Sequence, residues 1–195
     1  MKKYAAIVLA AGASKRLGKP KQLLPYQNST LLNHSIQELL QLESVDVYVI
    51  LGAYADDILL TVHKLKVTTV LNNDWEKGMG TSLSAGIAEI QKQGAYDGVI
   101  VSLSDLPYID TKHYQKLIQS FEDGNGLTVT QYSDFNGVPC MIGSKYFSEL
   151  EGLTGDEGAK PLMKKYQKEV SKIASETSYF DVDTDESYQK LINLS

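Results

Sequence analysis

The chain has 195 residues, of which 43% are apolar, and carries 19 Lys and Arg against 24 Asp and Glu, for a net charge of -5. This length predicts one domain, residues 1–195, and the slight acidic excess counts against nucleic acid as a partner, because no face-wide excess of Lys and Arg is available to neutralise a phosphate backbone. A single cysteine, Cys140, rules out an internal disulfide, and no apolar run reads as a signal segment or a membrane span, so we expect a cytoplasmic protein with no membrane partner.

Strands and helices alternate in the predicted secondary structure. Short runs rich in Val, Ile, Leu or Tyr predict strands at 4–10, 45–51, 67–71, 98–104, 127–132, 138–142 and 169–174. Helical spacing of apolar residues appears at Leu31, Leu32, Ile36, Leu39 and Leu40, after the cap candidates Ser29 and Thr30, and again at Leu83, Ile87 and Ile90. Further helices are expected over about 55–64, 111–121, 157–167 and 184–193.

This order predicts an α/β fold, a three-layer α/β/α sandwich with a mostly parallel sheet and helices on both faces. Asn136-Gly137, between two strand-like runs, predicts one antiparallel excursion. In such sheets ligands bind beyond the carboxyl ends of the strands, and the loop after the first strand falls at that edge.

The loop after the first strand is basic and rich in glycine. Gly12 lets the backbone turn so that successive N–H groups face an anion, and Lys15, Arg16, Lys19 and Lys21 add positive charge. The loop is not a Walker A motif, since five residues separate its glycines and Pro follows the lysine. It also lacks the glycine spacing of a dinucleotide fingerprint. A nucleoside triphosphate site is therefore predicted, and the alternative is a merely basic surface loop.

Two acidic segments are candidate metal sites. Asp105 ends the apolar strand 99–104, where a carboxylate can hold magnesium against triphosphate oxygens; the alternative is that it caps or turns the chain before the helix at 111. Residues 180–188, FDVDTDESY, contain acids in close order, but Gly and Glu are missing from the positions that a calcium-binding EF-hand loop requires. In this segment Asp183 or Thr184 is also well placed to cap the last helix.

A third stretch, NNDWEKGMGTSLSAG at 72–86, holds two glycines before a helix and the Ser82 hydroxyl. Its backbone groups and hydroxyl can contact a base edge, although an ordinary helix entry is the alternative and Trp75 alone is typical of a core residue. Lys160, in GDEGAK at 155–160, is either a contact to the second substrate or an exposed helix lysine.

These motifs together resemble the nucleotidyltransferases of the nucleotide-diphospho-sugar transferase fold. The form LAAGASKRLGKPKQLLPY, Leu9 to Tyr26, is most similar to the molybdenum cofactor cytidylyltransferase branch of the MobA-like NTP transferase family. Four further stretches continue the resemblance. They are the Asp-x-Pro after the strand at 99–104, the NxxWxxGMxxS stretch within 72–86, GDEGAK at 155–160, and the DxDTxxDY ending, in which Ser187 stands in place of Asp.

The resemblance implies roles for individual residues. It implies catalytic roles for Arg16, Lys21 and Asp105, and metal binding by Asp105 and Asp183, with Mg²⁺ as the metal and Mn²⁺ as the alternative. It implies nucleotide binding by Leu9, Ala10, Ala11, Gly12, Ala13, Ser14, Arg16, Lys21, Asn73, Gly78 and Ser82. Ala11, where guanylyl-transferring relatives usually have Gly, favours CTP as the nucleotide.

The implied reaction is attack by a phosphate of the acceptor on the nucleotide α-phosphorus, with release of pyrophosphate and no protein nucleophile. The implied acceptor is a molybdopterin-type cofactor, used by a molybdenum hydroxylase client. Val138 stands where the branch commonly has His, which leaves the acceptor open.

Three alternatives remain. The first is transfer to another small phosphate such as a sugar phosphate. The second is a non-catalytic accessory protein that binds the cofactor for a xanthine dehydrogenase-like enzyme. The third is an oxidoreductase, against which the missing dinucleotide fingerprint counts.

Overall fold

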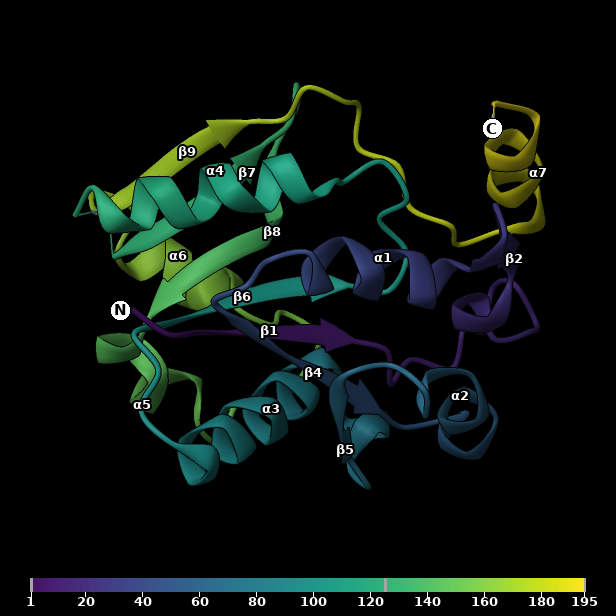
Figure 1. The fold of residues 1–195 in the computed structure, drawn as a ribbon, viewed down its shortest axis with the longest axis horizontal. Helices are drawn as coiled ribbons and strands as arrows, with labels where there is room; N and C mark the ends of the chain where they lie inside the picture. The colour runs from purple at the N-terminus through teal and green to yellow at the C-terminus, as the bar shows by residue number, and fades with distance from the viewer. Residues whose placement is uncertain (1, 125, 195) are drawn as a thin grey trace.

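The computed structural model describes residues 2–124 and 126–194, and a seven-stranded sheet runs through their centre (Figure 1). The sheet has the order β5-β4-β1-β6-β8-β7-β9. The strands are β1 (Tyr4–Leu9), β4 (Val45–Leu51), β5 (Val67–Leu71), β6 (Gly98–Leu103), β7 (Leu127–Gln131), β8 (Asn136–Gly143) and β9 (Val170–Ala174). A strand is found in each of the predicted places. Most residues of the inner strands are buried, whereas the edge strands β5 and β9 have only intermediate and exposed residues.

Most strand pairs are parallel, and β8 is the antiparallel excursion. β1 pairs in parallel with β4 and β6, β4 with β5, and β7 with β9, whereas β8 runs antiparallel to both β6 and β7. The position of the reversal differs from the prediction. Asn136 and Gly137 are not in the turn but in β8, opposite Gln131 and Thr130, and the chain reverses at 132–135, where Tyr132 N donates to Phe135 O at 2.9 Å.

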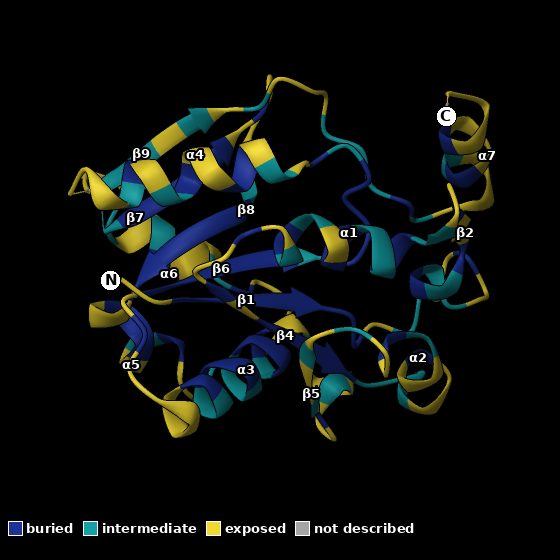
Figure 2. Cartoon of the chain, in the orientation of Figure 1, coloured by how far each residue is buried: buried dark blue, intermediate teal, exposed yellow. Residues whose placement is uncertain are grey.

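Helices cover both faces of the sheet, as predicted. The core on one face takes residues from α1 (Leu31–Leu40), α2 (Ala55–Val62) and α4 (Thr111–Glu122). The core on the other takes residues from α3 (Met79–Gln93), α5 (Phe147–Leu150) and α6 (Lys160–Lys165). Buried residues follow the strands and the inner sides of these helices (Figure 2). The structure is therefore the three-layer α/β/α sandwich that the alternating pattern predicts.

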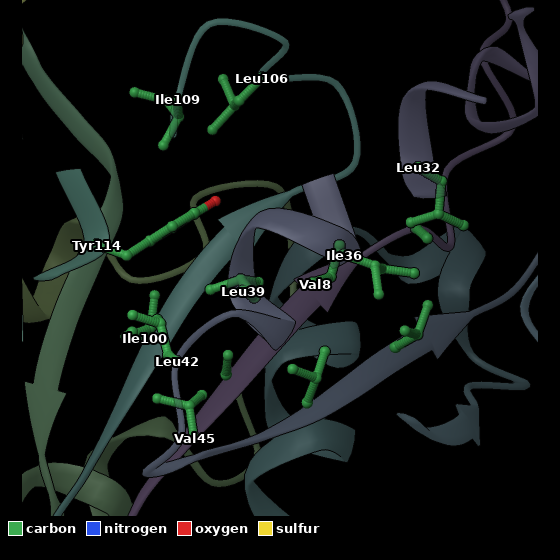
Figure 3. Packing of buried hydrophobic residues seen from close by; sticks show 14 of the residues in the cluster. Val8, Leu32, Ile36, Leu39, Leu42, Val45, Ile100, Leu106, Ile109 and Tyr114 are labelled. Atoms are coloured by element: carbon green, nitrogen blue, oxygen red, sulfur yellow. The ribbon is translucent and has the colours of Figure 1, made fainter. Parts of the chain in front are cut away.

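Helix α1 illustrates how the apolar spacing becomes packing. Its buried Leu32, Ile36 and Leu39 lie in the same cluster as Val8 of β1 (Figure 3). Thr30 is its N-cap, with its side chain accepting a hydrogen bond from Asn33 N at 3.2 Å, as one of the two cap candidates predicts.

Some local elements differ from the expected bounds. The helix expected over 157–167 is the shorter α6, and α5 and a small hairpin of β2 (Pro25–Tyr26) and β3 (Ser29–Thr30) were not expected. Short 3-10 helices lie at Lys21–Leu23, Trp75–Lys77 and Ser144–Tyr146. Within 2–124 and 126–194, no helix has the length and apolar character needed to cross a bilayer.

Helix α7 (Asp185–Leu194) returns the end of the chain to the loop after β1. Its Tyr188 and Leu191 are buried in one cluster with Leu17 and Leu24, and the Tyr188 hydroxyl donates to Pro25 O at 2.8 Å. This cluster is separate from the cores on the two faces of the sheet. Because α7 packs in this cluster, the acidic segment before α7 lies near the carboxyl end of β1.

Candidate active site

The loop after β1 turns at Ser14 and Gly18 rather than at Gly12. Ser14 has a φ of 50° and Gly18 a φ of 69°, whereas Gly12 is not among the residues with positive φ. Ser14 O accepts hydrogen bonds from Leu17 N and Gly18 N, both at 3.0 Å, and Ser14 Oγ accepts one from Lys21 N at 3.2 Å. The expected turning role of Gly12 is therefore wrong, and the Ser14 side chain fixes the backbone at Lys21.

Several partners hold the carbonyl groups of this loop. Gln22, which is buried, donates through Nε2 to Ala10 O at 2.8 Å and to Gly12 O at 2.9 Å. Ala53 N donates to Ala11 O at 3.1 Å. Sequence reasoning missed Gln22, whose one available signal is a polar residue directly before Leu23 and Leu24. These bonds hold the loop in one shape before a ligand arrives.

Gly52 lets the loop pack closely on the end of β4. A Cβ at this position would lie 2.6 Å from Ala11 O and 2.8 Å from Trp75 Cβ, so a larger residue would force the two segments apart. Nothing in the sequence around Gly52 indicates this contact, because it joins segments that are distant along the chain.

The charged centre of the site joins the loop, the end of β6 and the segment before α7. Lys21 Nζ lies 2.5 Å from Asp105 Oδ2 and 2.8 Å from Asp183 Oδ1, and Arg16 also forms an ion pair with Asp183. Three of the residues predicted to be catalytic or metal-binding, Lys21, Asp105 and Asp183, are thus in direct contact. Arg16 reaches the cluster from solvent, with its side chain 73% exposed.

The environment shifts the pKa values of these groups in different directions. Burial raises the pKa of Asp105, even though the nearby Lys21 ammonium opposes the shift. Burial acts against the charge of Lys21, but the Asp105 and Asp183 carboxylates outweigh it and hold the pKa of Lys21 above its usual value. For Asp183, burial acts upward, yet Lys21 and Arg16 bring its pKa below the usual value. The raised pKa of Lys21 and the lowered pKa of Asp183 both favour the charged forms of this ion pair, whereas burial favours the neutral form of Asp105.

Neither carboxylate acts as the helix cap that sequence reasoning kept as an alternative. Asp110, not Asp105, caps α4, with its side chain accepting a hydrogen bond from His113 N at 2.9 Å. Thr184 Oγ1 accepts one from Ser187 N at 3.1 Å at the start of α7. Ser187 Oγ in turn accepts from Asp183 N at 3.1 Å, so the residue that departs from the family pattern still holds the backbone of this turn.

The acidic residues fit a divalent cation. Asp105, Asp181 and Asp183 each offer a carboxylate oxygen, and these oxygens lie within 4.8 Å of one another. Carboxylate oxygens are the ligands that hard cations such as Mg²⁺ and Mn²⁺ prefer. Sequence reasoning carried over Asp183 alone from this segment, so Asp181 is an addition by the structure.

A cavity of about 310 Å³ opens beside the charged centre. Of the residues predicted to bind nucleotide or metal, those that line it are Leu9, Ala11, Gly12, Ala13, Lys21, Gly78, Ser82 and Asp105. Lys15, one of the four basic residues of the loop, also lines it. Ala10, Ser14, Arg16, Asn73 and Asp183 are not among its lining residues.

Asn72, rather than the predicted Asn73, contacts a residue that lines this cavity. Asn73 is exposed, whereas Asn72 is buried and donates through Nδ2 to Thr81 Oγ1 at 2.9 Å and to Ser82 Oγ at 3.0 Å. Two neighbouring asparagines cannot be told apart from local sequence, because their exposure depends on how the segment leaves β5. The structure thus assigns the positioning of Ser82 to Asn72.

Gly78 is required by its backbone and by its neighbours. Its φ is 108°, and a Cβ would lie 2.4 Å from both Gly155 C and Gly155 O. We expect Gly78→Ala to lower the free energy of unfolding by more than about 3 kcal/mol, because backbone strain adds to a clash with main-chain atoms. Thermal or denaturant unfolding measures this change.

Gly124→Ala is the matched control for Gly78→Ala. Gly124 has a similar φ of 101°, but a Cβ at this position would have no atom within 4 Å, so only strain of about 1–3 kcal/mol is expected. Equal losses in the two variants would contradict the close packing of residues 155–156 on the start of α3.

The comparison with protein-family models identifies the domain. Residues 6–170 match the model of the MobA-like NTP transferase domain. Nicotine blue oxidoreductase of Paenarthrobacter nicotinovorans is 29% identical, covering 95% of both chains, and purine catabolism protein PucB of Bacillus subtilis is 28% identical, covering 93% of this chain and 92% of that protein. Molybdenum cofactor cytidylyltransferase of Escherichia coli is 26% identical, covering 68% of this chain and 65% of that enzyme.

Solved structures share this fold. Rv0371c from Mycobacterium tuberculosis superposes with a TM-score of 0.86 at 27% identity, covering 98% of both chains. A manganese complex of Rv0371c superposes with a TM-score of 0.82 at 24% identity, again over 98% of both chains. Because the family model spans most of the chain, from β1 to the start of β9, the protein belongs to the MobA-like NTP transferase family and has its nucleotidyltransferase domain.

Proposed function

We propose that residues 1–195 form one transferase domain that moves a nucleoside monophosphate, CMP from CTP, onto a phosphate of a molybdopterin-type cofactor and releases pyrophosphate. The observation that carries the proposal is the contact of Lys21 with Asp105 and Asp183 beside the 310 Å³ cavity. The relative that transfers cytidylyl groups to molybdenum cofactor supports this choice of substrates. The single buried Cys140 supports a reducing, cytoplasmic setting.

The metal would bind to the carboxylates of Asp105 and Asp183, with Asp181 completing the set. A bound Mg²⁺, or Mn²⁺ as the alternative, would neutralise charge on the phosphate oxygens. The Lys21 ammonium and the Arg16 guanidinium would hold triphosphate oxygens from the loop side, because both lie at the same acidic cluster. The protein's own contribution is thus to orient the triphosphate and to offset its charge.

No covalent step on the protein is required. An oxygen of the acceptor phosphate forms the new bond to the α-phosphorus, and the bond to the bridging oxygen of pyrophosphate breaks. Cys140 is unsuited to compete as a nucleophile, because burial raises the pKa of its thiol to about 12. The acceptor phosphate is already anionic, so the step does not depend on a strong general base.

Base choice is expected to depend in part on Ala11. Its side chain lines the nucleotide cavity and packs toward Gly52. Ala11→Gly should raise the use of GTP relative to CTP without inverting the preference, because one methyl group alters discrimination by only about 1–3 kcal/mol. The ratio of kcat/KM for CTP to that for GTP measures this preference. An unchanged ratio in the variant would show that Ala11 does not select the base, and Gly78 and Ser82 would be the next candidates.

The test of the proposed function is pyrophosphate release with Mg²⁺ and each nucleoside triphosphate, with and without molybdenum cofactor. Release that depends on CTP and cofactor is the expected result. Turnover with a sugar phosphate instead would favour the other small-phosphate transferases. Tight binding without turnover would favour an accessory protein, and hydride transfer with NAD(P)H would favour an oxidoreductase, the activity named for one relative.

A further inference from the structure

Charges of both signs line the nucleotide cavity. The loop after β1 contributes Lys15 and Lys21, and the segments around the start of α3 contribute the carboxylates of Glu76 and Asp156. Asp105, the third acid in the lining, is already paired with Lys21. A triphosphate is attracted by the cations and repelled by unpaired carboxylates. Glu76 and Asp156 therefore suit the uncharged part of a nucleotide, which is the ribose and the base.

The main chain fixes the position of Asp156. Gly155, directly before it, donates through its N–H to Lys77 O at 2.9 Å, and its carbonyl oxygen accepts a hydrogen bond from Gly80 N at 2.8 Å. A Cβ at Gly78 would lie 2.7 Å from Asp156 Oδ1. The carboxylate thus lies against Gly78, in the stretch whose backbone is expected to contact the base.

The carboxylate of Asp156 is available to a ligand. Asp156 is exposed, and among the residues that the structure describes no ion pair or hydrogen bond engages its side chain. It does not cap α3, because the N-cap, Gly78, receives no hydrogen bond from a side chain. A carboxylate accepts hydrogen bonds and donates none, so its partner in the ligand must be a donor.

The bases differ in whether they offer such a donor. Cytosine, adenine and guanine carry an exocyclic amino group, whereas uracil has a carbonyl oxygen, O4, where cytosine has its amino group. A carboxylate placed against O4 would oppose one acceptor with another and leave both unsatisfied. Asp156 therefore reads the amino group, and the methyl group of Ala11 restricts the size of the base. The two features together select cytosine.

We propose that Asp156 is a specificity-determining residue of the nucleotide cavity, which accepts a hydrogen bond from the exocyclic amino group of the base and thereby excludes uracil nucleotides. This inference rests on the proposed function and assigns a further part of its base choice. The base is a better partner than the ribose, because the ribose is bonded directly to the phosphates that the carboxylate repels.

A second, larger cavity of about 510 Å³ adjoins the nucleotide cavity, and Asp156 lines both. Asn136, Glu157 and Gln167 contribute polar groups to the larger cavity alone. A ligand there has hydrogen-bonding partners other than Asp156, whereas the part of the nucleotide cavity at Gly78 has no other aspartate near its main chain among the described residues. The experiments below separate the two sites.

The first test is the ratio of kcat/KM for CTP to that for UTP in pyrophosphate release by Asp156→Asn. Asn can donate through Nδ2 to O4 of uracil and still accept from the amino group of cytosine through Oδ1. The ratio should fall by at least about tenfold, with a rise in the use of UTP. Loss of the negative charge affects both nucleotides alike, so the ratio cancels it. A purely structural role would not raise the use of UTP, and an unchanged ratio would overturn the inference.

Glu157→Gln is the matched control, because Glu157 is exposed, follows Asp156 directly and does not line the nucleotide cavity. Its CTP-to-UTP ratio should equal that of the wild type. Glu76→Gln tests the other unpaired acid of the cavity, and a shift in the ratio in this variant with none in Asp156→Asn would overturn the assignment. Selectivity between CTP and 2′-deoxyCTP that changes in Asp156→Asn, while the ratio of CTP to UTP does not, would place the carboxylate at the ribose and would also overturn it.

Failure of this inference can be told apart from failure of the proposed function. Trp75, the one tryptophan of the chain, lines the nucleotide cavity, so its fluorescence measures the Kd of Mg²⁺·CTP and Mg²⁺·UTP without turnover. A preference for CTP in binding that Asp156→Asn removes, without any turnover, would support the inference and contradict the transferase reaction. Turnover of CTP with molybdenum cofactor at an unchanged ratio in Asp156→Asn would overturn the role of Asp156 and leave the proposed function standing. A change confined to the KM for the cofactor would place Asp156 at the second substrate and overturn the inference.

Discussion

Replacement of Asp105 by Asn is expected to abolish turnover while the protein stays folded. Asn keeps the size and most of the hydrogen bonding of Asp but removes the negative charge that a hard cation prefers. Magnesium-dependent pyrophosphate release should fall by at least about a hundredfold, the scale expected for loss of an electrostatic contact in the transition state. Folding should survive, because burial already raises the pKa of Asp105 and a neutral side chain relieves that unfavourable burial of charge.

Asp110→Asn is the matched control for Asp105→Asn. Asp110 is exposed and caps α4, and Asn caps helices about as well as Asp, so this variant should keep both activity and stability. Binding of Mn²⁺, followed by electron paramagnetic resonance, gives a readout that does not depend on turnover. Wild-type Mn²⁺ affinity and activity in a folded Asp105→Asn protein would remove Asp105 from the metal site.

Lys21→Ala is expected to give the largest loss of turnover among the basic residues of the loop after β1. Lys21 Nζ forms ion pairs with Asp105 and Asp183, the carboxylates that would hold the cation. The Lys21 side chain is mostly shielded from solvent, so salt screens these interactions poorly. A fall in kcat of at least about a hundredfold is expected for an interaction that is stronger in the transition state. Affinity of the nucleotide-free protein for Mn²⁺ should rise, because the ammonium no longer competes for Asp105 and Asp183.

The other cations of the loop should rank below Lys21. Arg16→Ala should lower turnover strongly but less, since its guanidinium reaches Asp183 from solvent. Lys15→Ala should give a small loss that grows at low salt, because Lys15 is exposed at the cavity. Lys19→Ala is the matched control: Lys19 pairs with the exposed Asp185 at 2.8 Å and does not line the cavity.

Steady-state kinetics of these variants at low and moderate salt, with saturating Mg²⁺, decides the ranking. Equal and fully salt-screened losses at Lys15, Arg16 and Lys21 would show that the loop is only an electropositive surface. The proposed catalytic roles of Arg16 and Lys21 would then be withdrawn.

The strands, the helices and the layering of this protein follow from local sequence. Leu32, Ile36 and Leu39 recur at helical spacing, and Ile7 to Leu9 form a continuous apolar run, so each segment buries its apolar side in only one kind of element. Thr30 ends up as the cap of α1 for the same local reason. Periodicity and caps act over a few residues, and they are therefore visible without the fold.

Turn positions were less predictable, because several local signals compete. Asn136-Gly137 is a strong hairpin signal, yet these residues lie in β8, where they pair with Gln131 and Thr130 of β7. Likewise Gly12 is the more permissive residue, but the hydroxyl of Ser14 bonds the Lys21 amide and stabilises a positive φ at Ser14 instead. Strand pairing with β7 at the first place, and a hydrogen bond within the loop at the second, outweighed the intrinsic preference of these residues.

The meeting of Lys21, Asp105 and Asp183 depends on the tertiary structure. Family resemblance pointed to all three residues, but their contact exists because Tyr188 and Leu191 of α7 bury their side chains beside the loop after β1. Local sequence gave at most a weak signal for the roles of Gln22, Gly52, Asn72 and Asp181, since these roles are hydrogen bonds, close approaches or shared ligands between separate segments of the chain. Local sequence determined which elements form, and long-range burial decided which side chains they bring together.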